Sequence, residues 1–253
     1  MTKSTLKIVS LNIEADRHLE AVANFIHVQK PDVVMLQEVL DKNIGYFEKS
    51  IGMKGIYAPQ NVIYDDTEEY TLGLLTLTNL SVSNSYSAYY KGSADKLPRL
   101  HIGETPEGSA RVLLVTEVTK ENRHYRLLNT HFTWTPNGKP NEQQCQDLEI
   151  LLKILEKIPE FVFCGDFNAP RGTAIFDAIA KRYKDNIPIE ITTTIDKNLH
   201  KAGDLNYVVD GLFTTSRYLA NVVKIHNGVS DHCGVTAEIK INDQMSIHQI
   251  THE

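Results

Sequence analysis

The sequence predicts an α/β fold in which two mixed β-sheets pack together and helices lie outside them. Three observations support this fold. Short apolar or β-branched runs recur from residue 6 to residue 241, several segments carry apolar residues at helical spacing, and the order changes from alternating strand and helix to strand-rich. No internal repeat and no low-complexity linker divides the chain. We therefore expect one domain over residues 1–241, followed by a polar tail over residues 242–253.

The N-terminal part alternates strand and helix. The β-rich run Leu6–Ile13 predicts a strand, and Asp16–Lys30 has apolar residues at helical spacing, with Asp16 as its N-cap. Pro31 ends this helix. The continuous apolar run Asp32–Val39 is typical of a strand that is buried on both faces.

The remaining elements are mostly strands. Two further helices are predicted over Asn141–Ile158, where four leucines share one face, and over Thr173–Tyr183. Strands are predicted over Leu72–Thr78, Ser81–Tyr90, Ala110–Thr119, His124–Phe132, Phe161–Cys164, Tyr207–Phe213, Asn221–His226 and Gly234–Ile241.

The composition is that of an ordinary globular protein. Of the 253 residues, 42% are hydrophobic and 23% are charged, which allows a substantial core without staples. The net charge of −6 argues against a protein that coats duplex DNA, because such proteins carry a basic face. It does not exclude a nuclease, since a bound cation supplies positive charge locally.

Cysteine usage and the absence of targeting signals point to one compartment. Cys145, Cys164 and Cys233 fit neither a disulfide framework nor a zinc pattern, and they favour a reducing environment. No secretory signal pattern precedes the first strand, and no apolar run has the length needed to span a bilayer. We expect a cytoplasmic monomer without a membrane anchor.

Polar side chains stand where the predicted apolar strands end or begin. Catalytic and ligand-binding residues of α/β folds often occupy such positions. The residues concerned are Asn12, Glu38, His131, Asp166, Asn168, Asp210, Asp231 and His232.

Each of these residues also has a purely structural interpretation. Asn12 bonds the backbone at a strand end, a lone histidine such as His131 is more often a satisfied core residue, and the segment from Gly165 to Pro170 builds a turn. Ser230-Asp231-His232 is a surface turn on this interpretation. Asp210 resists it, because its apolar neighbours predict burial and a buried carboxylate needs a partner.

Taken together, these side chains suit the hydrolysis of phosphate esters. The ester is anionic, and a hard cation with oxygen ligands neutralises its charge, with Glu38 as the best single ligand for Mg2+. A histidine held by a carboxylate is a common base for the attacking water, and His232 with Asp210 would supply it. Neutral Asn168 and cationic His131 suit the stabilisation of the charged transition state.

The order of the motifs carries more information than any one of them. They are Leu11-Asn12-Ile13, Leu36-Gln37-Glu38-Val39, Asn129-Thr130-His131-Phe132, Gly165-Asp166-Phe167-Asn168, Asp210 and Ser230-Asp231-His232. In this order the sequence resembles the endonuclease/exonuclease/phosphatase superfamily, from about Lys7 to about Ile241.

The resemblance implies a four-layered α/β sandwich with the site at one edge of the paired sheets. It implies that Asn12, Glu38 and Asp231 face a metal ion, Mg2+ with Mn2+ as a substitute. It further implies that His131 contacts the scissile phosphate, Asn168 binds it, and Asp210 orients His232. Either Asp166 or His232 is then the base.

Departures from the family pattern indicate which branch of the superfamily this sequence is most similar to. The abasic-site endonucleases usually have Trp where Leu11 stands, and they lack a histidine where His131 stands. The Asn-Thr-His motif is more similar to the deoxyribonuclease, sphingomyelinase, inositol-phosphatase and deadenylase branches.

Segments around the expected site bear on the substrate. Residues 59–70 form an acidic loop that would repel a nucleic-acid backbone. Residues 86–101 combine tyrosines with basic side chains, which suits stacked single-stranded bases or is an ordinary solvated strand pair. Trp134, Arg99 and His200 are the candidate substrate-binding residues.

Three functions are compatible with these residues. The first is a Mg2+-dependent phosphodiesterase of nuclease type, with DNA or RNA as the candidate partner. The second is a phosphatase or phosphodiesterase acting on a small or lipid-derived phosphate ester. The third is a catalytically inactive interaction module, which is disfavoured because every candidate catalytic position carries a competent side chain.

Overall fold

The fold contains two mixed β-sheets, and the computed structural model describes residues 5–104 and 106–243 of the chain. The seven-stranded sheet has the order β12 (Tyr218–His226), β13 (Gly234–Ile241), β1 (Leu6–Asn12), β2 (Val33–Leu40), β4 (Glu69–Thr78), β3 (Lys54–Tyr64) and β6 (Arg99–His101). The six-stranded sheet has the order β10 (Lys184–Asp185), β11 (Asp210–Thr214), β9 (Val162–Asp166), β8 (Arg123–His131), β7 (Arg111–Lys120) and β5 (Ser81–Lys91).

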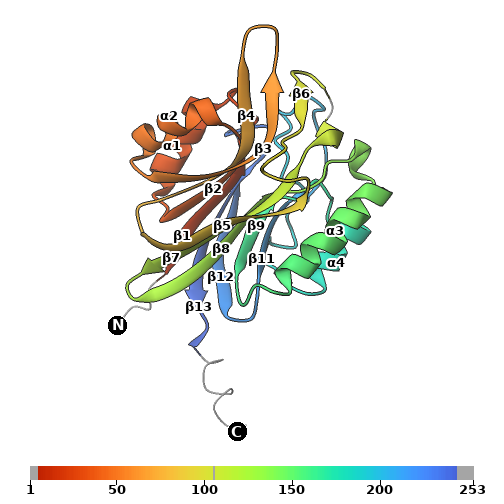
Figure 1. Cartoon of the computed structure of the whole chain (residues 1–253). Helices are drawn as coiled ribbons and strands as arrows, with labels where there is room; N and C mark the ends of the chain where they lie inside the picture. Colours follow the sequence, from red (N-terminus) through yellow and green to blue (C-terminus); the bar gives the residue numbers. More distant parts are fainter. Residues whose placement is uncertain (1–4, 105, 244–253) are drawn as a thin grey trace.

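In the part of the chain that the structure describes, four α-helices cover the outer faces of the sheets, which gives four layers (Figure 1). They are α1 (Leu19–Gln29), α2 (Ile44–Ile51), α3 (Glu142–Leu155) and α4 (Ala174–Ala180), and short 3-10 helices span Asp41–Asn43, Pro106–Gly108 and Pro136–Gly138. One apolar cluster between the sheets joins Ile8 and Met35 to Leu127 and Cys164. Separate clusters join α1 and α2 to the first sheet and α3 and α4 to the second. The predicted sandwich of two mixed sheets flanked by helices is confirmed.

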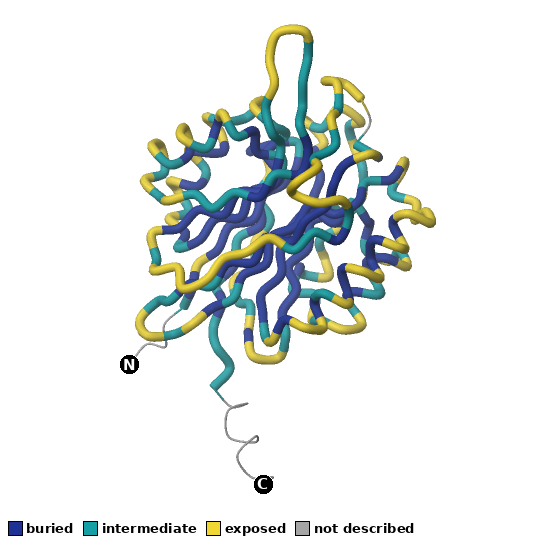
Figure 2. Tube along the Cα trace, viewed as in Figure 1, coloured by how far each residue is buried: buried dark blue, intermediate teal, exposed yellow. Residues whose placement is uncertain are grey.

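Burial follows the position of each strand in its sheet. All residues of β9 and β11 are buried, because these strands lie inside the second sheet and are covered on both faces. β5 lies at the edge of that sheet, and its first seven residues are exposed. Figure 2 shows this contrast between the buried centre and the exposed edge.

The strand directions bring the expected site residues to one edge of both sheets. β1 and β2 are parallel, and so are β8 and β9, so the carboxyl ends of each pair lie together. Asn12 ends β1, His131 ends β8 and Asp166 ends β9. β11 runs antiparallel to β9 and begins at this edge, where Asp210 pairs with Asp166.

The structure corrects the expected loop over residues 59–70. These residues are the end of β3, a turn and the start of β4, which form a hairpin that projects from the body (Figure 1). The sequence of β3 contains Gly55, Pro59 and polar residues, so it has no clear strand pattern, and a register shift at Pro59 accommodates the proline. Helix α2 was also not predicted.

The first helix begins later than expected. α1 starts at Leu19, and Asp16 is not its N-cap. Residues 14–18 form a turn instead, and His18, with a φ of −125°, is the residue that precedes the helix. Asp16 instead pairs with Lys42 at 3.3 Å.

The C-terminal segment is described only in part. Asp243 forms an ion pair with Arg123 at 3.0 Å, so the expected tail has at least one contact with β8 at its start. Residues 244–253 lie outside the described residues.

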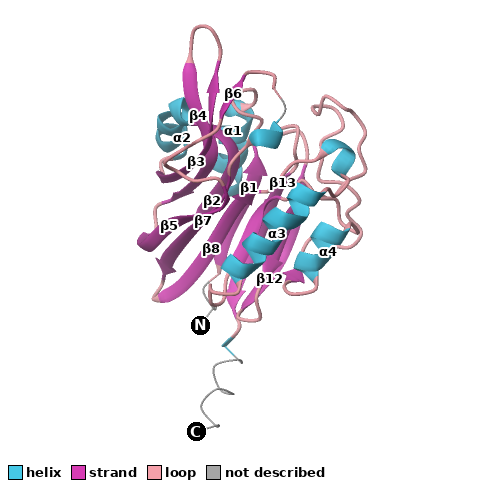
Figure 3. Cartoon of the chain, turned by 45° about the vertical axis from the view of Figure 1, so that its right-hand side comes forward, coloured by secondary structure: helices cyan, strands magenta, loops and turns pink. Residues whose placement is uncertain are grey.

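Within the described residues, no helix is both long and apolar enough to cross a membrane. The turned view in Figure 3 shows α3 and α4 on the outer face of the second sheet.

Candidate active site

Side chains from both sheets meet at the shared edge. The Asn12 amide Nδ2 donates to Glu38 Oε1 at 3.0 Å and to Asp166 Oδ2 at 3.1 Å. His131 Nε2 lies 3.7 Å from Glu38 Oε1 and 3.5 Å from Asp166 Oδ2. His232 Nε2 lies 3.7 Å from the same Asp166 oxygen. These contacts join five of the eight residues predicted to form the site, and Asn168 and Asp210 are hydrogen-bonded to members of this group.

A β-bulge places Glu38 at the edge. Leu36 pairs with Leu75 and Val39 pairs with Gly73, so that two residues of β2 stand opposite one residue of β4. Glu38 takes a φ of 57°, which is uncommon for a residue with a side chain. Such strained positions often occur at functional sites.

Gly165 and Asn168 shape the turn that presents Asp166. A Cβ atom on Gly165 would lie 1.9 Å from the carbonyl oxygen of Thr130, and φ is 150°, so only glycine fits this approach of β9 to β8. The Asn168 backbone N–H donates to Asp166 Oδ1 at 2.8 Å, and the Asn168 amide donates to the Phe132 carbonyl at 3.1 Å. The turn therefore holds the Asp166 carboxylate in one orientation.

Asp210 and His232 form the second half of the site. His232 Nδ1 donates to Asp210 Oδ2 at 2.9 Å, because a carboxylate accepts hydrogen bonds. The Thr194 hydroxyl oxygen accepts the backbone N–H of Asp210 at 3.0 Å and fixes the start of β11. Asp210 and His232 are both buried.

The environment of His131 keeps its ring neutral. Burial, with the nearby Arg111 guanidinium, lowers the pKa of His131 to about 3. The expectation of a cationic His131 is therefore corrected: near neutral pH the ring of the metal-free protein is a neutral hydrogen-bonding group.

Burial and neighbouring carboxylates shift the pKa values of Glu38 and His232. Burial raises the pKa of Glu38 to about 7; the hydrogen bond from Asn12 opposes this, and the negative charges of Asp231 and Asp166 add to it. Burial disfavours the charged form of His232, but Asp210 and Asp166 outweigh it, and the pKa of His232 lies well above its ordinary value. The metal-free site therefore concentrates negative charge that a bound cation would offset.

The donor chemistry of the site fits a hard divalent cation. Glu38, Asp166 and Asp231 supply carboxylate oxygens, and oxygen is the ligand that Mg2+ prefers. Carboxylate and imidazole atoms of Asp166, Asp210 and His232 also lie within 4.8 Å of one another. We assign Asp210 and His232 to each other rather than to a metal, because Asp210 Oδ2 and His232 Nδ1 are both occupied by the hydrogen bond between them.

Asp231 and His200 lie at the margin of this cluster. The Ser230 hydroxyl donates to Asp231 Oδ1 at 3.2 Å, and the charge of Asp231 acts on both Glu38 and His232. The His200 ring centroid is 6.5 Å from that of His232. Asp196 holds the His200 loop, because its backbone carbonyl accepts the N–H of His200 at 2.8 Å.

Trp134 and Arg99, the other two candidate substrate-binding residues, have different surroundings from His200. Trp134 is partly buried and follows His131 by three residues. Arg99 pairs with Glu69 through two hydrogen bonds of 2.9 and 2.6 Å and lies over the ring of Tyr64, so its contacts are with the β3–β4 hairpin. The structure does not bring Arg99 to the carboxylate cluster.

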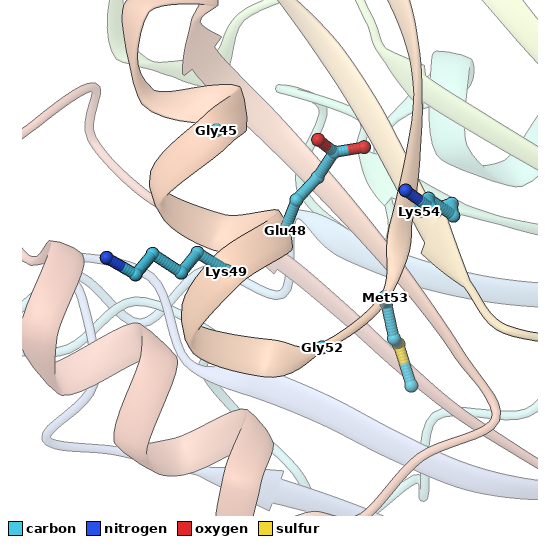
Figure 4. Close-up of a pocket in the computed structure, with 6 residues that line it drawn as sticks. All are labelled: Gly45, Glu48, Lys49, Gly52, Met53 and Lys54. Atoms are coloured by element: carbon cyan, nitrogen blue, oxygen red, sulfur yellow. The ribbon is translucent and has the colours of Figure 1, made fainter.

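The hollow shown in Figure 4 is separate from this site. It lies at the end of α2 and the start of β3, and its lining residues are Gly45, Glu48, Lys49, Gly52, Met53 and Lys54. β3 begins opposite Thr78, the end of the first sheet that is remote from Glu38. The Glu48 carboxylate accepts the backbone N–H of Gly55 at 2.8 Å, so it has a structural partner there.

Several residues around the site had no predicted role. Gln37 and Asn129 form a buried hydrogen bond of 2.7 Å between the sheets, and Arg111 donates to the His131 carbonyl at 3.1 Å. Gln37 and Asn129 stand inside the motifs, so their positions were visible in the sequence. Their contact was not, because it joins strands of different sheets.

Comparisons with known proteins agree with this geometry. The model of the Endonuclease/Exonuclease/phosphatase family matches residues 9–232. No curated protein matches the sequence at a significant level. An endonuclease/exonuclease/phosphatase from Bacteroides vulgatus has a similar structure, with a TM-score of 0.73 and 18% identity over 95% of this chain and 100% of its own.

Two further solved structures share the fold. A mannosyl-6-phosphatase from Bacteroides thetaiotaomicron has a TM-score of 0.68 and 12% identity, and the match covers 92% of this chain and 99% of the other. The catalytic domain of human nocturnin, with a bound sulfate anion, has a TM-score of 0.66 and 17% identity over 94% of each chain. On the family match across most of its length, this chain belongs to the endonuclease/exonuclease/phosphatase family.

Proposed function

We propose that this protein is a Mg2+-dependent phosphoester hydrolase. The observation that carries the proposal is the convergence of Glu38, Asp166 and the Asp210–His232 pair at one edge of the two sheets. The carboxylates favour a cation, and the histidines and amides are donors for a phosphate. A catalytically inactive interaction module would have no need for this arrangement.

Glu38 and Asp231 are proposed to hold the cation, and the expected role of Asn12 as a ligand becomes a positioning role, because its Oδ1 accepts the backbone N–H of Glu14 at 3.1 Å. A divalent cation in this position would neutralise negative charge on the phosphate and act as a Lewis acid. Glu38 is 28% exposed, so one side of its carboxylate is accessible from solvent. The Asn12 amide donates to both Glu38 and Asp166, which holds these two carboxylates in a fixed relation before any ligand binds.

His131 and Asn168 are proposed to bind the phosphate oxygens. His131 Nε2 points toward Glu38 and Asp166, and its neutral ring donates one hydrogen bond without adding a charge. Donors fixed in advance are effective where charge develops in the transition state. Either Asp166 or His232 is proposed to accept the proton of the attacking water, and the raised pKa of His232 favours Asp166 for this step.

For the substrate class we propose a phosphodiester, as for a nuclease. The Asn129-Thr130-His131 motif is compatible with this choice, because it is similar to the deoxyribonuclease and deadenylase branches as well as to the sphingomyelinase and inositol-phosphatase branches. The second candidate is a small phosphate ester, and the β3–β4 hairpin favours it. Its turn carries Asp65 and Asp66, it projects from the same edge of the first sheet at which Glu38 stands, and an acidic hairpin disfavours a long polyanion.

One panel of substrates tests these proposals. The purified protein is incubated with Mg2+ and bis-p-nitrophenyl phosphate, p-nitrophenyl phosphate, plasmid, single-stranded DNA or RNA. Turnover of diesters and nucleic acid supports a nuclease-type enzyme. Turnover of the small esters alone supports the second candidate. No turnover of any substrate would contradict the hydrolase and favour an interaction module.

A further inference from the structure

Two consecutive residues of β2 face the second sheet, although neighbouring residues of a regular strand point to opposite faces. Gln37 reaches Asn129 of β8 at 2.7 Å, and Glu38 lies 3.7 Å from His131 of the same strand. The β-bulge at Gln37 and Glu38 explains this arrangement, because it inserts one extra residue between Leu36 and Val39.

The two contacts lie next to each other and join the same two strands, β2 of the first sheet and β8 of the second. Asn129 and His131 are two residues apart on β8, so their side chains share the face that looks toward the first sheet. Each meets one of two consecutive residues of β2. The Asn129 amide also donates to the backbone carbonyl of Leu36 at 3.0 Å, which ties β8 to the backbone just before the bulge.

The Gln37–Asn129 bridge is not explained by stability. Both side chains are fully buried, and Gln37 Oε1 has no hydrogen-bond partner among the described residues. A buried polar atom without a partner is costly, whereas an apolar pair of the same shape can be neutral or stabilising. A buried unsatisfied group in a native protein requires an explanation of its own.

We propose that Gln37 and Asn129 are a positioning pair that sets the separation between Glu38 and His131. Glu38 belongs to one sheet and His131 to the other, so sliding of the sheets changes this separation directly. The bridge stands immediately beside both residues and resists such sliding. The inference rests on the proposed function, in which Glu38 holds the cation and His131 binds the phosphate.

The test uses four variants of the full chain: Gln37→Met, Asn129→Leu, the apolar double variant, and the exchanged pair Gln37→Asn with Asn129→Gln. For each we would measure Tm, and kcat and KM for whichever ester the wild type hydrolyses. Thr78→Val is the matched control. The Thr78 hydroxyl donates to the Asp32 carbonyl at 2.8 Å, and Thr78 pairs with Val33 at the end of the sheet remote from Glu38.

Each single variant should lower both Tm and kcat, because the remaining buried amide loses its partner in the other side chain and keeps its backbone contact, Asn129 with Leu36 or Gln37 with Met35. The apolar double variant should recover Tm, while kcat stays low by ~10-fold or more with KM little changed, since misplacement of about 1 Å can cost ~10²-fold in rate. The exchanged pair should recover part of kcat. Thr78→Val should lower Tm and leave kcat unchanged.

A purely structural role makes the opposite prediction for the double variant. Recovery of kcat together with Tm in the double variant would overturn the inference. Crystal structures of the metal-free wild type and double variant give a readout that does not need activity: the Glu38 Oε1 to His131 Nε2 distance, 3.7 Å here, should differ between the two proteins. An unchanged distance would also overturn the inference. If the wild type hydrolyses no ester, the proposed function fails, and this distance still decides the positioning role.

Discussion

Asp210 Oδ2 accepts a hydrogen bond from His232 Nδ1 at 2.9 Å, and this contact leaves His232 Nε2 facing Asp166 Oδ2 at 3.7 Å. The three residues come from β11, the segment before β13, and β9. Antiparallel pairing of Asp210 with Asp166 brings two of them together, and burial of all three makes their orientation specific.

The first prediction concerns this pair. His232→Ala should lower kcat by ~10²-fold or more, because the reaction loses a positioned proton-transfer group. Asp210→Asn should also lower kcat, since an amide can hold the ring in the wrong tautomer. Steady-state kinetics on a diester would measure both. His226→Ala is the control and should leave kcat unchanged, because His226 forms a hydrogen bond with Thr236 between β12 and β13. An unchanged rate in His232→Ala would exclude a catalytic role for His232.

The second prediction concerns the cation. Glu38→Gln should abolish Mg2+-stimulated turnover, because it removes the carboxylate charge while the amide keeps the side chain's size. EDTA should have the same effect on the wild type, and excess Mg2+ should reverse it. Glu20→Gln, an exposed change in the first turn of α1, should leave turnover intact. Full activity of Glu38→Gln would exclude Glu38 as the main ligand.

The third prediction is a pH dependence of stability. Burial raises the pKa of Glu38 from 4.5 to about 7 in the metal-free fold. The folded protein then holds a proton that the unfolded chain releases, so this contribution to the free energy of unfolding is complete below pH 4.5 and is lost as the pH rises through about 7.

Thermal unfolding with and without Mg2+ tests this linkage. Because the cation offsets the charge of this partly buried carboxylate, the rise in Tm on adding Mg2+ should be larger above pH 7 than below it. Glu38→Gln should lose most of this pH dependence. A Mg2+ effect that is equal on both sides of neutrality would contradict the link to Glu38.

The fourth prediction concerns the neutral ring of His131. His131→Ala should lower kcat by ~10²-fold, as expected when one fixed donor to the transition state is lost. His131→Gln should retain more activity, since a neutral amide still donates a hydrogen bond and the native ring is itself neutral. Equal loss in both variants would show that more than a neutral donor is required.

The fifth prediction concerns Gly165. Gly165→Ala should lower the free energy of unfolding by ~1–3 kcal/mol or more, because the new Cβ would lie 1.9 Å from the Thr130 carbonyl oxygen. Denaturant unfolding would measure this change. Gly172→Ala is an informative control: φ is also positive there, at 88°, but a Cβ meets no atom within 4 Å. Equal losses would mean that the φ angle, rather than the close approach, decides the effect.

Much of the fold followed from local sequence patterns. Continuous apolar runs such as Asp32–Val39 and Phe161–Cys164 predicted the buried strands, because a strand that is covered on both faces needs apolar residues on both. β3 was missed, because Pro59 and its polar neighbours obscure the strand pattern, and pairing with β4 and β6 stabilises the strand. The start of α1 was misplaced, because the backbone of Glu14 and Ala15 follows the turn after β1 and not the preference of Asp16 for an N-cap.

The sequence by itself determined which side chains are available for catalysis and the order in which they occur, and this order predicted the family. Only the tertiary structure decided which of them meet. The bulge that turns Glu38 toward His131, the bridge between Gln37 and Asn129, and the ion pair that draws Arg99 to the hairpin all join residues far apart in the chain. The neutral state of His131 likewise depends on burial and on Arg111. Such contacts and pKa values arise from packing between sheets, which local sequence patterns do not encode.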